Sequence, residues 1–441
     1  MNCRMKNRTT TSIKNQSPLG LYHQAIAFIV LGLVCVSSYG SEAVAERMSS
    51  LLSSVQSART GSSPDGGSEN GGGPAGTMDF SEADAAFAGF LEGSPIFDGI
   101  SYVVVDGDQV LHTAVFGDHS EDLVVMLAST SKVPAVMTLL ALEEDPDVAF
   151  RMDQPIGEVL PFDGVYGDRT PSQLVSNTSG IPGLRALEDY GDHLCQFNNL
   201  PFTTFESCGE TLFSVELDDG NEAGSVFDYG GSQWQLAGVT ASIAANSEWN
   251  QLVDQYLVQP CGLEVFTFGN MWLDLTAWDG SPGSLKGQHN PSVEGGAITN
   301  LADYAKLLQI HLNGGYCGDT RVLSEEAIAE MRVDRGGVVP NAPTPYGMGW
   351  WISSDNPGVY YDPGAFGAIS FIDVERGIGG YVAIDDYSAV DAGAPIGLVR
   401  GTVIPLLQQA FDTTKSGSVA VTRQQGPGPE RSVNATASMK E

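Results

Sequence analysis

Two segments near opposite ends of the chain each predict a β-hairpin, and together they constrain the fold more than any other feature. The first joins residues 101–105 (SYVVV) to 109–115 (QVLHTAV), and the second joins 369–374 (ISFIDV) to 380–385 (GYVAID), each through a short turn that contains glycine. Short helices and loops are expected between them, and a closing helix over about 396–412. This order predicts an α+β fold: an antiparallel sheet built from both termini, flanked by helices, with an inserted mostly helical region.

Composition divides the chain into four segments. Residues 1–45 predict a signal peptide, because basic residues precede the apolar run 25–36 and small residues follow it. A run of that length is too short to cross a bilayer comfortably, so a cleaved secretory signal is favoured over an uncleaved N-terminal anchor. Residues 46–79 predict a Ser/Gly-rich linker and 414–441 a disordered tail, which leaves 80–413 as the folded domain.

The chain is strongly acidic, with 54 Asp and Glu residues against 21 Lys and Arg residues and a net charge of −33. A surface of this charge repels the phosphates of nucleic acids and the head groups of anionic membranes. We therefore expect no nucleic-acid partner. We also expect no stable membrane partner unless the N-terminal segment stays uncleaved.

Four cysteines follow the expected leader: Cys195, Cys208, Cys261 and Cys317. In an oxidising compartment they could form two disulfides, with three possible connectivities. No Cys-x-x-Cys pair, His/Cys cluster or H-E-x-x-H motif is present in the sequence. We therefore expect neither a metal nor a cofactor.

The stretch 126–145 (MLASTSKVPAVMTLLALEED) places Ser129 and Lys132 at the start of an apolar helix. At this spacing the two side chains would share one helical face. A desolvated lysine can take the proton of a serine hydroxyl, and the helix N-terminus favours the negative charge that develops. The competing interpretation is a capped helix whose lysine amine reaches solvent. Because short motifs occur by chance, the context has to decide between the two.

Other catalytic patterns find no support. No G-x-S-x-G elbow occurs, which disfavours an ordinary α/β-hydrolase. No carboxylate pair stands out as a glycosidase dyad. The histidines beyond the leader belong to no motif, and we expect each to be a surface group or a satisfied interior group: His112, His119, His193, His289 and His311.

Over about residues 85–412, the chain resembles the serine β-lactamase-like family, which includes class C β-lactamases, D-alanyl-D-alanine carboxypeptidases and related esterases and peptidases. The resemblance rests on ASTSK (128–132), MDQPIGEVLP (152–161), TPSQLVSNTSGIPGL (170–184), EGGAITNLADYAKLLQIHLNGG (294–315) and YGMGWWI (346–352), in the family's order. It implies the β-lactamase/transpeptidase-like fold, with Ser129 as the nucleophile and Lys132 beside it.

The family's second motif, Tyr-x-Asn, is similar to the stretch FDYGGSQWQLAG, which supplies Tyr229. The resemblance implies that Tyr229 is a base or shares the serine proton with Lys132. The position of the asparagine holds Gly231, so the amide that would bind the substrate's acyl carbonyl is missing. The alternative is that Tyr229 is a packed aromatic residue beside a glycine turn.

The third motif, Lys-Thr-Gly or His-x-Gly in relatives, aligns with a stretch that begins at Asp362 and includes Gly364. Gly364 would let the backbone approach the substrate closely. The resemblance implies an oxyanion hole formed by the N–H groups of Ser129 and Ala365. The family's cation at this motif faces a substrate carboxylate, and here Asp362 replaces it. We expect Asp362 at the mouth of the site, where it would repel carboxylate-bearing lactams.

These features predict an exported serine hydrolase, periplasmic or secreted, that acts through a Ser129 acyl-enzyme on a small ester or amide substrate. One alternative is a β-lactamase or D,D-peptidase, acting on penicillins or peptidoglycan stem peptides, whose cation comes from elsewhere, for example from Lys286 or Arg185. A second alternative is a non-catalytic binding protein on the same fold, because two of the three motifs are altered.

Overall fold

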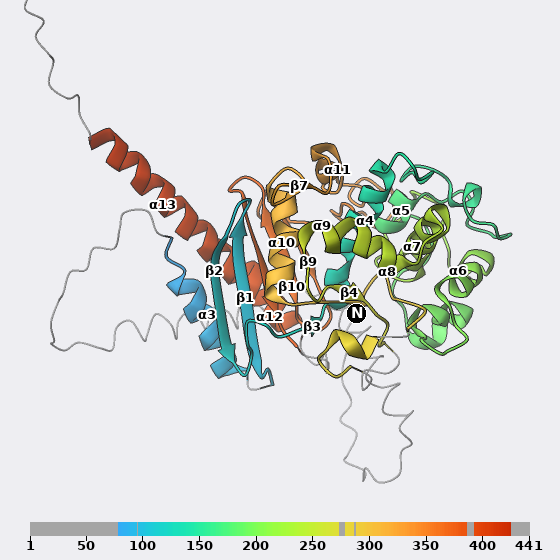
Figure 1. Cartoon of the computed structure of the whole chain (residues 1–441), viewed down its shortest axis with the longest axis horizontal. Coiled ribbons are helices and arrows are strands. Elements are labelled where there is room, and N and C mark those ends of the chain that lie inside the picture. The colour runs from blue at the N-terminus through green and yellow to red at the C-terminus, as the bar shows by residue number, and fades with distance from the viewer. Residues whose placement is uncertain (1–77, 95, 273–277, 286–287, 386–391, 425–441) are drawn as a thin grey trace, which may run out of the picture.

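The structure is a computed structural model that describes residues 78–424, except 95, 273–277, 286–287 and 386–391 (Figure 1). The expected signal peptide, most of the expected linker and the last part of the expected tail lie outside the described residues, as does Lys286. Within the described part of the chain, no helix is both long and apolar enough to cross a membrane.

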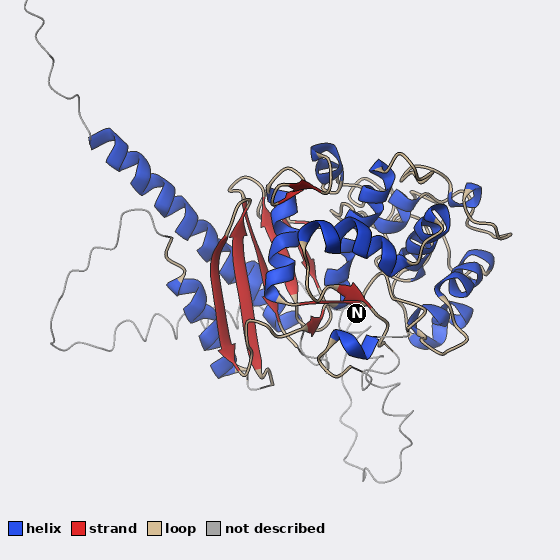
Figure 2. Cartoon of the chain, in the orientation of Figure 1, coloured by secondary structure: helices blue, strands red, loops and turns tan. Residues whose placement is uncertain are grey.

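A six-stranded antiparallel sheet with the order β2-β1-β11-β10-β9-β8 brings the two ends of the domain together (Figure 2). Strands β1 and β11 pair inside it, with Ser101 opposite Ala383 and Asp106 opposite Ile378. The strands are β1 Gly99–Asp106, β2 Val110–Gly117, β8 Trp351–Ile352, β9 Val359–Pro363, β10 Ile369–Asp373 and β11 Ile378–Ala383. Both expected hairpins are present, and the predicted α+β architecture is confirmed.

Helices cover the sheet and fill the inserted region. The helices beside the sheet are α3 Ser81–Gly93, α10 Leu301–Leu312, α12 Gly393–Leu398 and α13 Ile404–Gln424. Those of the inserted region are α4 Lys132–Glu144, α5 Pro171–Val175, α6 Phe205–Ser214, α7 Ser232–Ala245, α8 Trp249–Val253, α9 Gln259–Cys261 and α11 Glu325–Glu330. Two small sheets complete the fold, β3-β5-β4 (Val125–Met126, Ala297–Thr299, Thr267–Phe268) and β6-β7 (Tyr316–Cys317, Thr320–Arg321).

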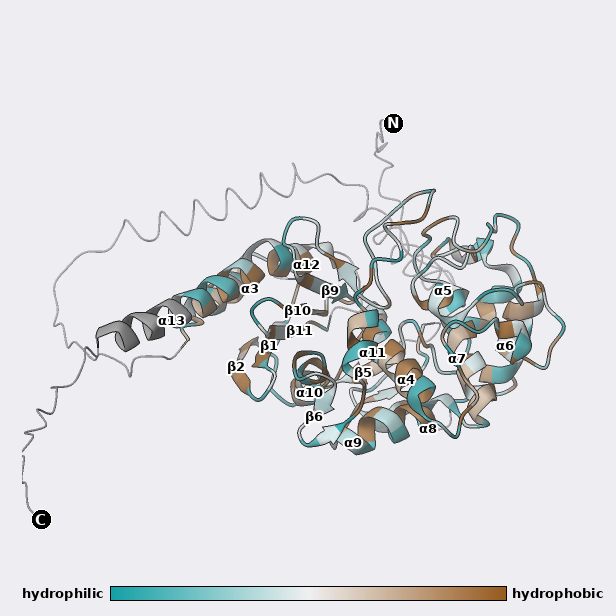
Figure 3. Cartoon of the chain, turned by 90° about the horizontal axis from the view of Figure 1, so that it is seen from above, coloured by the Kyte–Doolittle hydropathy of each residue, from teal (hydrophilic) through white to brown (hydrophobic). Residues whose placement is uncertain are grey.

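The central strands β1, β10 and β11 are buried on both faces of the large sheet. Successive side chains of a strand point to opposite sides, so each of these strands contributes to two cores. On β1, Tyr102 and Val104 pack with α3 and the C-terminal helices. Val103 and Val105 point the other way, into the larger core that also contains residues of α4, α7 and α10. Figure 3 shows this arrangement from above, with α3, α12 and α13 on one side of the strands and α10 on the other.

The C-terminal helix is longer than the sequence predicts. Helix α12 continues into a π-helical turn, Val399–Val403, and then into α13, which ends at Gln424 and not near residue 412. The segment expected to be a disordered tail from residue 414 therefore begins as helix. Pro405 is the second residue of α13, just after the π-helical turn. Proline has no N–H to donate and its ring crowds the carbonyl four residues earlier, and a wider turn at that point accommodates both effects.

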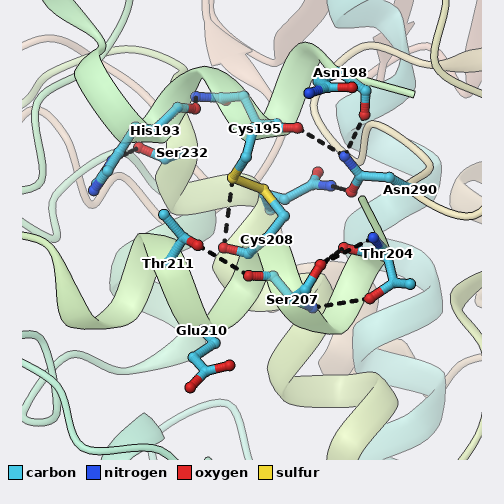
Figure 4. Close-up of a disulfide and its surroundings, with 12 residues drawn as sticks. His193, Cys195, Asn198, Thr204, Ser207, Cys208, Glu210, Thr211, Ser232 and Asn290 are labelled. Atoms are coloured by element: carbon cyan, nitrogen blue, oxygen red, sulfur yellow. Dashed lines mark hydrogen bonds between the residues drawn. A yellow bond between two sulfur atoms is a disulfide. The ribbon is translucent and has the colours of Figure 1, made fainter. Parts of the chain in front are cut away.

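The four cysteines pair as Cys195–Cys208 and Cys261–Cys317. The first disulfide joins a 3-10 helical segment to α6, and Figure 4 shows the polar contacts around it. There the Asn290 side chain donates to the Cys195 carbonyl at 2.8 Å and so fastens a third segment to the bridge. The second disulfide joins α9 to β6. Both bridges therefore hold the inserted region together.

Loss of the second disulfide should destabilise the protein more than loss of the first. A cross-link restricts the unfolded chain, and its effect grows with the length of the closed loop, which spans 56 residues for Cys261–Cys317 and 13 for Cys195–Cys208. Chain entropy gives about 4 and about 3 kcal/mol, respectively. Denaturant unfolding of the two Cys→Ser double variants measures the difference. A larger loss at the shorter loop would mean that native packing, and not loop closure, dominates.

Candidate active site

Ser129 lies in a short 3-10 helix, Ala128–Ser131, that connects β3 to α4. Ala128 has a φ of +46°, a left-handed conformation that residues with a Cβ seldom adopt, so the surroundings have to hold this turn in place. One such restraint is the Thr130 hydroxyl, which donates to the Asp362 carbonyl at 3.0 Å. The segment that carries the candidate nucleophile is therefore fastened to strand β9 of the large sheet.

The end of β9 approaches this segment closely at Gly364. A Cβ at that position would collide with the Leu127 carbonyl oxygen and lie 2.9 Å from the Thr130 hydroxyl, so only glycine fits. The Gly364 N–H is already used, since it donates to the Ala368 carbonyl at 2.7 Å. The N–H of the next residue, Ala365, has no backbone acceptor among the described residues.

Lys132 is the first residue of α4, and its amine is enclosed by protein, with 1% of the residue exposed. The amine donates to the Ser129 hydroxyl oxygen at 3.1 Å and to the Glu294 carbonyl at 2.9 Å. Burial lowers the pKa of Lys132, while the nearby carboxyl groups of Glu294 and Asp362 act in the opposite direction. The competing interpretation, a lysine whose amine reaches solvent, is wrong.

Tyr229 completes a group of three side chains at this point. The Lys132 amine lies 4.8 Å from the centre of the Tyr229 ring. Burial, helped by the negative field of Asp362, raises the pKa of Tyr229 well above its usual range, although the Ser129 and Trp351 side chains favour the ionised form. Its hydroxyl has no regular hydrogen bond to the described residues. Burial at this position therefore favours the neutral phenol form of Tyr229 over the phenolate.

The two glycines after Tyr229 make the turn that leads into α7. Both have left-handed backbones, with φ of +79° at Gly230 and +78° at Gly231. Asn177 holds the turn, since its side-chain oxygen accepts from the Gly230 N–H at 2.9 Å and from the Trp234 indole at 2.8 Å. A Cβ on Gly231 would lie 2.8 Å from the carbonyl oxygen of Pro182. An asparagine at the position of Gly231 would therefore be strained in this turn.

Glu294, which was not predicted from the sequence, lies inside the site with only 5% of the residue exposed. One carboxyl oxygen lies 3.6 Å from the Lys132 amine and accepts the Gly231 N–H at 2.9 Å. Burial raises the pKa of Glu294, and Lys132 and the Gly231 N–H oppose that rise. The signal was available, because Glu294 is an acid within a run of small and apolar residues (PSVEGGAIT).

The expectation for Asp362 is wrong. Its side chain is fully buried, with 0% exposed, and does not lie at the mouth of the site. Neither carboxyl oxygen has a hydrogen bond of ordinary geometry among the described residues. Burial raises the pKa of Asp362 well above its usual range, against the influence of Lys132 and the nearby Val133 N–H. Asp362 therefore lies inside the protein, close to Lys132, and cannot repel a substrate directly.

The other candidate groups lie elsewhere. Arg185 donates to the Asp219 carboxylate at 2.6 Å, so its charge is already paired.

The histidines also lie away from the group around Ser129. His289 is exposed. The other four contact different parts of the fold: His112 at Asp84, His119 at Ser101, His193 between Ser232 and Val215, and His311 at Trp350. His311 departs from expectation in one respect, because neither ring nitrogen has a hydrogen-bond partner in the described part of the chain. Burial lowers its pKa to about 3, so the ring is neutral.

The profile of the Beta-lactamase family matches residues 84–399. The chain belongs to the beta-lactamase family. Members of this family are typically serine hydrolases, which agrees with the contact between Ser129 and Lys132. No curated protein matches the sequence.

Solved structures of the same fold include a putative beta-lactamase from Bacteroides dorei, which is 25% identical with a TM-score of 0.60 over 75% of this chain and 100% of that chain. EstCE1, described as a hydrolase with promiscuous acyltransferase activity, is 17% identical with a TM-score of 0.59 over 73% and 98% of the two chains. An octameric penicillin-binding protein homologue from Pyrococcus abyssi is 18% identical with a TM-score of 0.57 over 73% and 77%. The last two similarities concern the fold alone.

Replacing Asp362 with asparagine should stabilise this family member at neutral pH. An aspartate in the unfolded chain ionises near pH 4, whereas burial makes the folded protein hold that proton to higher pH. The wild type therefore loses stability as the pH rises from about 4 towards the folded pKa, and a side chain that cannot ionise does not. We expect Asp362→Asn to raise the Tm at pH 7 and to leave it nearly unchanged at about pH 4. A lower Tm at pH 7 would mean that an ionised Asp362 contributes stability through Lys132.

Proposed function

We propose that the protein is an exported serine hydrolase that forms an acyl-enzyme on Ser129. The hydroxyl oxygen attacks an ester or amide carbonyl carbon, and its proton passes to the Lys132 amine as the new C–O bond forms. The bond to the leaving group then breaks, and the leaving group takes that proton directly or through the Tyr229 hydroxyl. A water molecule attacks the acyl carbon and gives a proton to Lys132, which returns it to the Ser129 oxygen as the acid is released.

The observation that carries this proposal is the buried contact of 3.1 Å between the Lys132 amine and the Ser129 hydroxyl. Burial lowers the pKa of Lys132, so a larger fraction of the amine is unprotonated and able to accept a proton. The same contact argues against a non-catalytic binding protein. A buried lysine is costly to stability, and binding alone gives no reason to hold one beside a serine.

The turn after β9 offers a place for the negative charge of the tetrahedral intermediate. We assign the oxyanion hole to the N–H groups of Ser129 and Ala365, which belong to the two segments that meet at Gly364. The Ala365 N–H is suited to this role because no backbone carbonyl in the described part of the chain accepts from it. Gly364 acts indirectly, by letting the two segments approach.

The substrate that we propose is a small neutral ester or amide. The positive charge of Lys132 is already used inside the site, where it opposes the rise that burial causes in the pKa values of Glu294 and Asp362. Arg185 is paired with Asp219. No described cation other than Lys132 shifts the pKa of either buried acid, and the net charge of −33 disfavours anionic ligands at long range. The Asp362 side chain does not contribute directly to this preference, because it is buried.

A β-lactamase or D,D-peptidase is the second candidate, because the chain belongs to the beta-lactamase family and is similar in structure to a putative beta-lactamase. The fold does not choose between these activities. It is shared by proteins described as a family VIII carboxylesterase and a D-stereospecific amidohydrolase, as well as by the putative beta-lactamase. The two disulfides are consistent with an oxidising compartment and so support export.

Ser129→Ala should abolish labelling by a fluorophosphonate probe and all ester turnover, while the thermal unfolding curve stays close to that of the wild type. The reason is that this hydroxyl forms the covalent intermediate. Mass spectrometry of the labelled wild type identifies the modified residue. Labelling of the variant at another serine would contradict the assignment.

Lys132→Arg should be nearly as inactive as Lys132→Ala, because a guanidinium cannot lose its proton at working pH.

Tyr229→Phe should lower kcat by roughly 10²–10⁴-fold, the usual range for lost general acid–base help. Steady-state kinetics with p-nitrophenyl acetate measure both effects. A Tyr229→Phe variant with near-normal kcat would show that the tyrosine only packs against its neighbours.

The preference for neutral substrates is tested with two esters of equal chain length, p-nitrophenyl butyrate and mono-p-nitrophenyl succinate. We expect kcat/KM to be at least about tenfold higher for the neutral ester. This ratio corresponds to an activation free energy that is about 1.4 kcal/mol higher for the succinate ester. A chromogenic cephalosporin serves as the lactam. Efficient cephalosporin hydrolysis together with a preference for the succinate ester would favour the β-lactamase candidate.

A further inference from the structure

The site contains a carboxyl group at a place where the family resemblance gives no reason to expect one. Glu294 lies on the segment that leads into β5, and its side chain points at Lys132, the first residue of α4. One oxygen lies 3.6 Å from the Lys132 amine and also accepts the Gly231 N–H at 2.9 Å. The Glu294 backbone carbonyl binds the same amine at 2.9 Å. This one residue therefore contacts Lys132 twice and fixes the turn that follows Tyr229.

The charges around Lys132 can be assigned from these contacts. The ionisable groups that face it are Glu294 before β5, Asp362 on β9 and Tyr229 before α7. Tyr190 and Tyr346 also lie within the field of Glu294. Two carboxylates and one ammonium would leave a net negative charge in a dry site, which is unfavourable. The proton is expected on Asp362, whose oxygens have no regular partner, and the negative charge on Glu294, which accepts the Gly231 N–H and lies 3.6 Å from the Lys132 amine.

We propose that Glu294 is the positioning residue for Lys132: it holds the amine against Ser129, and its negative charge keeps the amine basic enough to take the serine proton. Burial alone would make the amine a weak base, and proton transfer is most efficient when the base titrates near the working pH. The negative charge of Glu294 offsets part of the decrease in the Lys132 pKa that burial causes. The proposal rests on the proposed function, in which Lys132 is the proton acceptor.

The position of Gly231 supports this role. In the family's second motif, as the resemblance gives it, this position carries an asparagine, and its replacement by glycine removes a side chain from the site. The Glu294 carboxyl group binds the Gly231 backbone itself. Glu294 thus supplies a polar side chain next to Lys132 at the turn where the motif has lost one.

The test measures the titration of Lys132 directly. The chain has seven lysines, so the protein labelled with ¹³C at the lysine Cε gives a simple NMR spectrum, in which Lys132 is assigned by its absence in Lys132→Ala. Glu294→Gln removes the charge but keeps an oxygen that can accept the Gly231 N–H. We expect it to lower the midpoint of the Lys132 titration by about 1–3 pH units, the effect of an opposite charge at this distance. Asp362→Asn is the matched control, a second buried acid beside Lys132, and should move the midpoint less.

A second readout is the rate of fluorophosphonate labelling as a function of pH. Its acidic limb should move to lower pH in Glu294→Gln by the same amount as the NMR midpoint. Glu294→Asp, which retains the charge, should lie between the wild type and Glu294→Gln. If Glu294→Gln does not fold, the same two measurements are compared between Glu294→Asp, which keeps the negative charge, and Glu294→Ala, which removes it.

An unchanged Lys132 midpoint in the variant without the charge would overturn the proposal, as would an equal or larger shift in Asp362→Asn. The proposed function fails separately, if the wild type is not labelled at Ser129. In that case the NMR midpoint still reports whether Glu294 controls the protonation of Lys132.

Discussion

The amine of Lys132 is buried in the protein, and the arrangement of the site follows from the need to satisfy it. An ammonium group has three donors, and each needs an acceptor when water is excluded. Here the Ser129 hydroxyl and the Glu294 carbonyl bind the amine, and the Glu294 carboxyl group lies close by. Lys132 and Glu294 are 162 residues apart in the sequence. The site can therefore exist only where the start of α4 and the approach to β5 are packed against each other.

Features that depend on local sequence could be predicted. The hairpins were recognisable from β-branched and aromatic residues on either side of glycine turns, and they predicted an antiparallel sheet built from both ends of the domain. The contact between Ser129 and Lys132 was predictable for the same reason, because helical spacing alone brings the two side chains together. The extension of α13 past residue 412 was not, since its residues are neither strongly apolar nor regularly spaced.

Features that depend on partners far away in the sequence could not be predicted. Asp362 was aligned with a motif, but whether a strand residue faces the core or the substrate depends on the orientation of β9, and neighbouring residues of a strand face opposite ways. Glu294 is an ordinary acid until the fold places it beside Lys132. The disulfide connectivity had three possibilities until the ends of α9 and β6 were placed side by side. In each case the missing information was three-dimensional, not chemical.

The pairing of β1 with β11 has a consequence for how this protein is made. Ser101 and its partner Ala383 are 282 positions apart (383 − 101), so the centre of the large sheet cannot form until almost the whole domain has left the ribosome. Contacts this distant in sequence form slowly, because a long loop has to close before they contribute any stability. During synthesis β1 and β2 are a two-stranded hairpin with an unpaired edge, which is at best marginally stable and prone to pair with other chains. Until β11 is available, the β1 edge of this hairpin stays open to pairing with other chains.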